Sequence, residues 1–114
     1  MSDSIFSRIA RREIPADIVY EDDRLIAFKD ISPQAPVHVL FVPKLHYPTL
    51  NDVPENEAEL LGRMMLAAAD YARAQGFADR GYRLVMNCNR EGGQTVFHIH
   101  LHLLAGRTMD GGFG

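Results

Sequence analysis

Three histidines stand at every second position between residues 97 and 104, where the sequence reads FHIHLHLL. Side chains alternate across a β-strand, so a strand here would present His98, His100 and His102 on one face and apolar side chains on the other. The apolar side chains fix this register, because a slip by one residue would bury three imidazoles. Imidazole titrates near neutral pH and can act as a nucleophile, so the three histidines, here called the histidine row, suit acyl or phosphoryl transfer. Packing alone does not explain such a row, although a single surface histidine needs no function.

A metal site is a second hypothesis for the same histidines. Alternate residues of a strand lie about 6.6 Å apart, so the outer two imidazoles would be about 13 Å apart along the backbone. Zinc holds nitrogen at about 2.0–2.1 Å, and one ion cannot bind all three from one regular strand. Two neighbours together with His38 could bind an ion, but the sequence offers no cysteine pair in support. We therefore expect neither a metal nor another cofactor.

Composition limits the class of protein. The 114 residues are enough for one domain, and 46% hydrophobic with 24% charged residues is the balance of a globular chain. Twelve basic and fifteen acidic side chains give a net charge of −3, which argues against binding of DNA or RNA polymers but not of one nucleotide. Cys88 is the only cysteine. No secretory signal and no apolar run of about 20 residues is visible, so we expect a cytoplasmic protein that binds no membrane.

The elements that would position the histidines are short. We expect a helix over residues 4–12, which Pro15 stops, and a long helix over residues 53–75. Asp52 and Glu55 would cap the long helix and Gly76 would end it. Its side facing the sheet would consist of apolar residues at helical spacing: Leu61, Met64, Met65, Ala68 and Ala72.

Five strands are expected, over residues 17–20, 25–28, 37–42, 82–88 and 96–104. Short turns between consecutive strands favour antiparallel pairing. The sequence therefore predicts an α+β fold: an antiparallel meander sheet of about five strands, with one long and one short helix packed on one face.

The chain resembles the histidine triad superfamily, specifically its Hint branch of purine nucleoside phosphoramidases. The residues that carry the resemblance are DISPQAPVH at 30–38, GYR at 81–83 and GGQTVFHIHLH at 92–102, with Gly106 and Arg107 continuing it. Order and spacing agree from about Ile5 to Met109. The resemblance implies the fold of that superfamily, as a single domain over residues 1–114 with a flexible glycine-rich tail from about residue 107.

The resemblance also implies an activity, which is hydrolysis of the P–N bond in purine nucleoside 5′-phosphoramidates, with aminoacyl-adenylates as further candidate substrates. His100 would attack the α-phosphorus and form a covalent nucleotidyl-histidine, and water would release AMP or GMP. His98, His102 and His38 would orient His100 and stabilise charge on the phosphoryl oxygens. Which histidine gives a proton to the leaving amine stays open. The family further implies a homodimer with a nucleotide cleft on each subunit.

Nucleotide-binding positions follow one at a time from the resemblance. Asp30 would bind the two ribose hydroxyls, although on pattern alone it could cap the turn before Pro33. Asn87 would be a polar contact near the phosphate. The apolar purine slot would consist of Ile31, Phe28, Ile9, Phe6 and Ile5, and the loop that holds the α-phosphate of Gly93, Gln94 and Thr95.

Two other functions remain open. One is a nucleotide- or zinc-binding interaction protein whose turnover is incidental. The other is a dinucleoside polyphosphate hydrolase, as in the sister branch of the superfamily, but residues 32–36 and 92–94 look more like the Hint branch. Residues 110–114 lack the tryptophan-proline ending of some relatives, so the sequence does not predict the leaving-group preference.

Overall fold

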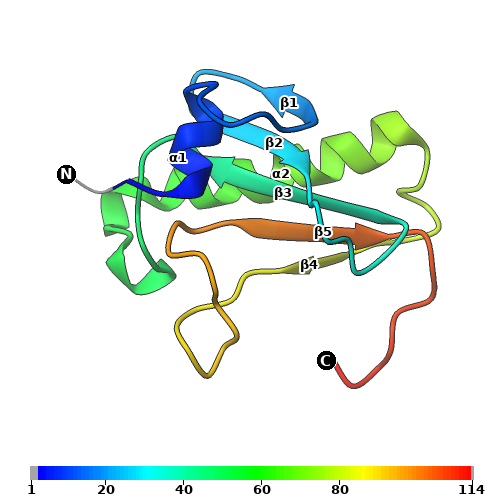
Figure 1. Cartoon of the computed structure of the whole chain (residues 1–114). Helices are drawn as coiled ribbons and strands as arrows, with labels where there is room; N and C mark the ends of the chain where they lie inside the picture. Colours follow the sequence, from blue (N-terminus) through cyan, green and yellow to red (C-terminus); the bar gives the residue numbers. More distant parts are fainter. Residues whose placement is uncertain (1–2, 114) are drawn as a thin grey trace.

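A five-stranded antiparallel sheet lies between two helices in the computed structural model, which describes residues 3–113 (Figure 1). Its elements in chain order are α1 (Ile5–Ala10), β1 (Ile18–Glu21), β2 (Leu25–Lys29), β3 (Val37–Pro43), two short 3-10 helices (Leu50–Asp52 and Glu55–Glu57), α2 (Ala58–Gln75), β4 (Arg83–Val85) and β5 (Leu101–Ala105). Within the described residues, no helix has the length and apolar character needed to cross a membrane.

The strand order is β1-β2-β3-β5-β4, with every neighbouring pair antiparallel. The expected α+β class and antiparallel sheet are therefore confirmed. The meander holds only from β1 to β3, because β5 returns to lie beside β3 and leaves β4 at the edge. Helix α2 connects β3 to β4 across a face of the sheet, and β4 joins the sheet one position beyond β5.

The two helices cover opposite faces of the sheet, so the expectation that both pack on one face is wrong (Figure 1). Met64 and Ala68 of α2 pack with Ala27, Val39 and Phe41. On the other face, the α1 residues Phe6 and Ile9 pack with alternate residues of the same strands: Ile26, Phe28, Leu40 and Val42. Both faces need a cover because β2 and β3 are apolar at almost every position, unlike strands with one solvated face.

Helix α2 begins at Ala58, five residues later than predicted. Asp52 does form a capping box, but with Thr49 at the start of the first 3-10 helix, so its carboxylate does not cap α2. The end of the helix is confirmed, since Gly76 adopts the left-handed conformation with φ 87°.

The predicted inward side of α2 is confirmed for Met64, Ala68 and Ala72. It is wrong for Met65, which is 53% exposed. Leu60 occupies the inward position instead, because residues 60, 64, 68 and 72 follow one another at four-residue intervals along the same side of the helix. Leu61 is partly buried against the same core.

The strands that flank the glycine loop are shorter than the predicted 82–88 and 96–104. Strand β4 covers Arg83–Val85 and β5 covers Leu101–Ala105. Of the histidine row, only His102 lies on a regular strand, while residues 96–100 approach the sheet as an irregular segment. The amide of Ile99 donates to the carbonyl of Tyr47 at 2.9 Å. Because Tyr47 lies outside the sheet, this bond takes the place of a bond in the strand ladder.

Candidate active site

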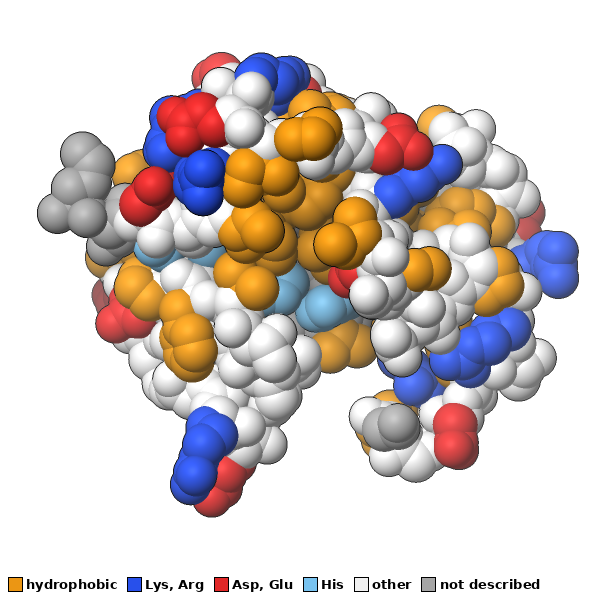
Figure 2. Space-filling view, viewed as in Figure 1, with side chains coloured by type: hydrophobic (Ala, Val, Ile, Leu, Met, Phe, Trp, Pro, Cys, Tyr) orange, Lys and Arg blue, Asp and Glu red, His pale blue; other side chains and the backbone are white. Residues whose placement is uncertain are grey.

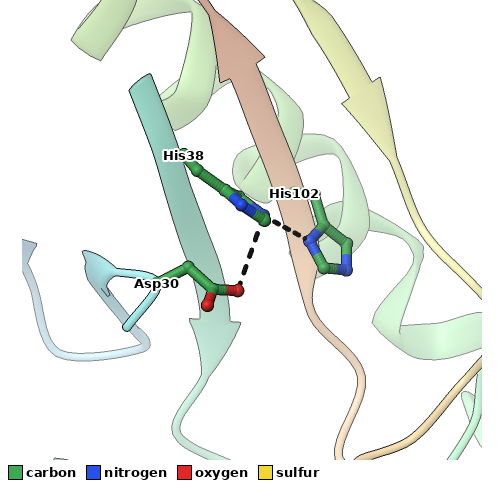
Figure 3. A group of neighbouring side chains, drawn as sticks. All are labelled: Asp30, His38 and His102. Atoms are coloured by element: carbon green, nitrogen blue, oxygen red, sulfur yellow. Dashed lines mark hydrogen bonds and ion pairs between the residues drawn. The ribbon is translucent and has the colours of Figure 1, made fainter. Parts of the chain in front are cut away.

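Two histidines from neighbouring strands meet on the α1 face of the sheet. His102 of β5 lies opposite Leu40 of β3, two residues along from His38. Nε2 of His38 is 2.9 Å from Nδ1 of His102 and 3.5 Å from a carboxylate oxygen of Asp30 (Figure 3). The backbone N–H of Gln34 donates to Nδ1 of His38 at 3.0 Å. Four groups thus form one continuous polar chain.

The Gln34 amide fixes the protonation of the whole chain. Since it can only donate, Nδ1 of His38 is an acceptor, and the neutral ring carries its proton on Nε2. That N–H donates to Nδ1 of His102, which places the proton of His102 on its Nε2. Nε2 of His102 is buried and has no hydrogen-bond partner within residues 3–113. The Nε2–H group of His102 is therefore available to donate to a bound ligand.

His100 is held in the opposite tautomer. Its Nδ1 lies 2.7 Å from the carbonyl oxygen of His98, and a carbonyl can only accept, so the proton is on Nδ1 and Nε2 keeps its lone pair. The ring is buried, with 7% of its surface exposed, and this burial lowers its pKa below the ordinary value. At neutral pH the side chain is thus an uncharged imidazole with one free nitrogen, as a nucleophile requires.

His98 differs from the other two histidines of the row because both of its ring nitrogens are hydrogen-bonded within the protein. Its ring is completely buried, Nε2 donates to the carbonyl of Pro43 at 2.7 Å, and Nδ1 is 2.7 Å from Oγ of Ser4. Burial lowers its pKa to about 4. The predicted alternation is confirmed, since Ile99, Leu101 and Leu103 join the core on the α2 side while the three imidazoles lie toward α1. The predicted regular strand over the whole row is wrong, because β5 begins only at Leu101. Phe97, expected inside, is 46% exposed.

Some of the side chains predicted to form a purine slot pack beside His100 on the α1 side. The Phe6 ring packs edge to face against the rings of His100 and Phe28, with centroid distances of 5.0 Å and 5.4 Å. Ile9 belongs to the same buried cluster. Ile5 and Ile31 are 48% and 95% exposed and do not belong to that buried cluster. Figure 2 shows histidine side chains recessed in the middle of this face, beneath a group of hydrophobic side chains.

The glycine loop is bonded mostly to itself. The amides of Gly93 and Gln94 donate to the carbonyls of Arg90 and Asn89. The Gln94 side chain accepts from the Asn89 amide and donates to two further carbonyls. These two amides thus donate within the loop, and the Gln94 side chain holds the loop in shape. The phosphate contact that the resemblance implies for them stays a prediction. Thr95, the third residue predicted to contact the phosphate, is exposed.

Asn87 follows the end of β4 and is half-buried. The pairing of Val85 with His102 directs this segment along the one that holds His100. Asp30 has one oxygen toward His38, and the other accepts from the Ser32 amide at 2.8 Å. The turn-capping role and a role in the site are thus both compatible with its position.

Asp30, His38 and His102 are also the group within residues 3–113 whose ligand atoms lie close enough to share a metal ion, all within 4.8 Å. The tautomers argue against that use. A metal on Nε2 of His38 needs a lone pair there, but Nδ1 already uses its own lone pair to accept from Gln34. A neutral imidazole has only one such pair, so this cluster fits a hydrogen-bond chain better than a metal site.

Sequence reasoning missed three partners of the histidines: the Gln34 amide, the Pro43 carbonyl and the Ser4 hydroxyl. It placed His46 at the surface or behind the reacting histidines, and the His46 ring does stack behind them, on His98, with the ring centroids 4.5 Å apart. Backbone groups give no signal in residue types. Ser4 carried one signal, since serine is a preferred helix N-cap.

Comparison with known proteins identifies the family. A model of the HIT domain matches residues 11–109. The chain belongs to the HIT domain family. It is 57% identical over 107 residues to a purine nucleoside phosphoramidase of Escherichia coli, covering 94% of this chain and 90% of that protein.

Solved structures of the family agree over the whole fold. A HIT family hydrolase from Legionella pneumophila superposes with a TM-score of 0.95 at 50% identity, covering 98% of this chain and all of the other. A histidine triad protein from Clostridium difficile gives 0.93 at 44% identity, with 96% of each chain covered. The sequence resemblance to this family is therefore confirmed.

Proposed function

We propose that this HIT domain hydrolyses the P–N bond of purine nucleoside 5′-phosphoramidates and releases AMP or GMP. The observation that carries the proposal is the tautomer of His100, whose Nδ1–H is held by the His98 carbonyl while Nε2 stays free and uncharged. The high identity to a purine nucleoside phosphoramidase over most of the chain supports the same reaction.

The reaction proceeds in two displacements at phosphorus. Nε2 of His100 forms a bond to the α-phosphorus as the P–N bond to the amine breaks, which leaves a nucleotidyl-histidine. Water then attacks the same phosphorus, and the P–N bond to His100 breaks. Over both steps one water is consumed, with its hydroxyl on the nucleotide and its proton on the amine.

A group of the site must donate a proton to the amine in the first step and take one from water in the second. His102 is suited to this role, because its Nε2–H has no partner among the described residues. Burial and the neighbouring histidines lower its pKa to about 4, and an arriving phosphoryl anion would raise it again. His38 orients His102 through the 2.9 Å bond.

The remaining positions would bind the nucleotide. Phe6, Ile9 and Phe28 would contact the purine, with the exposed Ile5 and Ile31 closing over it. Asp30 would accept from the ribose hydroxyls, and Thr95 and Asn87 would contact the phosphate. His98 takes no chemical part in this scheme, because both of its nitrogens are already bonded.

The test is hydrolysis of an adenosine 5′-phosphoramidate with an amine leaving group, in excess EDTA, compared with hydrolysis of a diadenosine polyphosphate. We expect rapid turnover of the phosphoramidate that survives EDTA, and a much slower reaction of the polyphosphate. Activity lost in EDTA would return the histidines to a metal site. Tight AMP binding without turnover would favour the binding-protein hypothesis.

We further propose that the domain is a homodimer in the cytoplasm, with the free Cys88 compatible with a reducing compartment. Two features support the dimer. Strand β4 is an open edge of the sheet, which a second copy can extend. Met65 of α2 is 53% exposed. Leu66 lines a hollow together with Tyr20 of β1, so it faces the β1 side of the helix. Met65, the preceding residue, is turned about 100° from Leu66 around the helix axis and lies on the side of α2 toward β4.

Met65→Glu is therefore expected to convert the dimer to a monomer, because a charge buried in the interface lacks a partner. Light scattering after size exclusion measures the mass. Leu66→Glu is the matched control, since this neighbour is also exposed, at 66%, but lies on the other flank and should leave the dimer intact. A dimeric Met65→Glu would place the interface elsewhere.

A further inference from the structure

Helix α1 is attached to the histidine row by a side chain that the proposed chemistry does not use. Oγ of Ser4, the residue before α1, lies 2.7 Å from Nδ1 of His98. The same oxygen accepts from the Ser7 amide at 2.9 Å, as an N-cap does. One hydroxyl thus caps the helix and bonds to an imidazole that is completely buried.

The direction of this bond follows from the other nitrogen of His98. Nε2 is 2.7 Å from the Pro43 carbonyl, which can only accept, so Nε2 carries the proton and Nδ1 has the lone pair. The Ser4 hydroxyl is therefore the donor. Oγ of Ser7 is also near Nδ1 but at 3.4 Å, and a single lone pair accepts one short bond. Ser4, His98 and Pro43 thus join α1 to the end of β3.

The peptide of His98 continues this chain to the nucleophile. Its carbonyl accepts from Nδ1 of His100 at 2.7 Å. His46 holds the same stretch from the other side: Nε2 is 2.6 Å from the Phe97 carbonyl, and the ring stacks on His98 with an interplanar angle of 18°. The ring of His98 and the carbonyl that orients His100 are therefore fixed together.

We infer that Ser4 is a positioning residue for His100, acting through His98, and that it couples the seating of α1 to the aim of the nucleophilic nitrogen. Helix α1 also carries Phe6, whose ring packs against the His100 ring with the two centroids 5.0 Å apart. Loss of the Ser4 bond would thus loosen the purine slot and the nucleophile at once. The kinetic part of this inference rests on the proposed function.

Three variants separate the bond from helix capping. Ser4→Thr keeps both the cap and the hydroxyl donor. Ser4→Gly keeps most of the capping preference but has no donor. Ser7→Ala removes the more distant hydroxyl of the same helix and is the matched control. We expect Ser4→Gly to lower kcat/KM by about tenfold in all, through both a lower kcat and a higher KM, which is the effect of one lost hydrogen bond, while the other two stay within about twofold of wild type.

Imidazole nitrogen NMR and amide hydrogen exchange, both without substrate, supply readouts that do not depend on turnover. In Ser4→Gly, His98 should lose the signature of a bonded Nδ1, His100 should populate its second tautomer, and the α1 amides should exchange faster than in Ser7→Ala. If wild type fails to hydrolyse phosphoramidates but these shifts occur, the coupling stands and the proposed function falls. The coupling is overturned if Ser4→Gly keeps the kcat, the KM and the His100 tautomer of wild type. It is also overturned if Ser4→Thr loses as much activity as Ser4→Gly. A change in melting temperature alone decides nothing.

Discussion

His100→Asn is expected to lower kcat/KM for an adenosine phosphoramidate by about 10⁴-fold or more, the scale on which removal of a covalent nucleophile acts. The reason is geometric. The Asn side chain can still donate an N–H toward the His98 carbonyl, but it places no lone pair where Nε2 of His100 stands, so the nucleotidyl intermediate cannot form. Steady-state kinetics measures the loss, and mass spectrometry of acid-quenched reactions measures the covalent nucleotide.

Binding and folding provide the controls for this variant. AMP should bind within a few-fold of wild type, because the proposed purine slot of Phe6, Ile9 and Phe28 is untouched, and the unfolding midpoint should change little. His102→Asn should be impaired less and should still accumulate the covalent intermediate, since it retains the nucleophile. Substantial turnover by His100→Asn would show that His100 is not the nucleophile and would redirect the search to the other histidines.

The sequence predicted the fold well wherever side-chain pattern decides it. Strands β2 and β3 are apolar runs bounded by turn residues, and Gly76 ends α2 as its conformational freedom allows. The same pattern could have shown that helices cover both faces, because strands without a polar side require two covers. The late start of α2 was harder to predict. Asp52 could form a capping box either with Glu55 or with Thr49, and in the structure it does so with Thr49.

The candidate site was predictable in its residues but not in their division of labour. Alternation along a regular strand assigns the same role to His98, His100 and His102, yet the strand begins only at Leu101. What separates the three is the backbone: the carbonyls of Pro43 and His98 and the amide of Gln34 fix which nitrogen carries a proton. Every residue has these groups, so their use leaves no mark in the sequence.

The same buried rings make stability depend on pH, and this is the second large expected effect. The folded pKa of His98 and of His102 is about 4 in each case, below the ordinary value of 6.5, chiefly because burial disfavours the charged form. Between these two pH values the unfolded chain binds more protons than the folded one. Stability is therefore fully present above about pH 6.5 and is lost as the pH falls toward 4.

The size of the loss follows from about 1.4 kcal/mol per pH unit for each proton. Between pH 7 and pH 5 we expect about 2 kcal/mol from the completely buried His98, and less from His102, whose partial exposure screens it. Urea unfolding at a series of pH values measures the total, which should be at least about 3 kcal/mol, because the lowered pKa values of His100 and His38 act in the same direction. The carboxylates with lowered pKa values, such as Asp22 at about 2, lose their contribution at lower pH and do not confuse this window.

His98→Gln assigns the effect to its source. This variant is less stable overall, but the informative quantity is the slope of its unfolding free energy against pH, which should fall by about one proton between pH 5 and 6. NMR titration of wild type gives the same answer without a mutation: the His98 signals should not move until the pH approaches 4. A wild-type stability that is flat from pH 7 to 5 would mean that the rings are not buried as neutral groups, and the tautomer assignment of His100, which depends on the same packing, would then lose its basis.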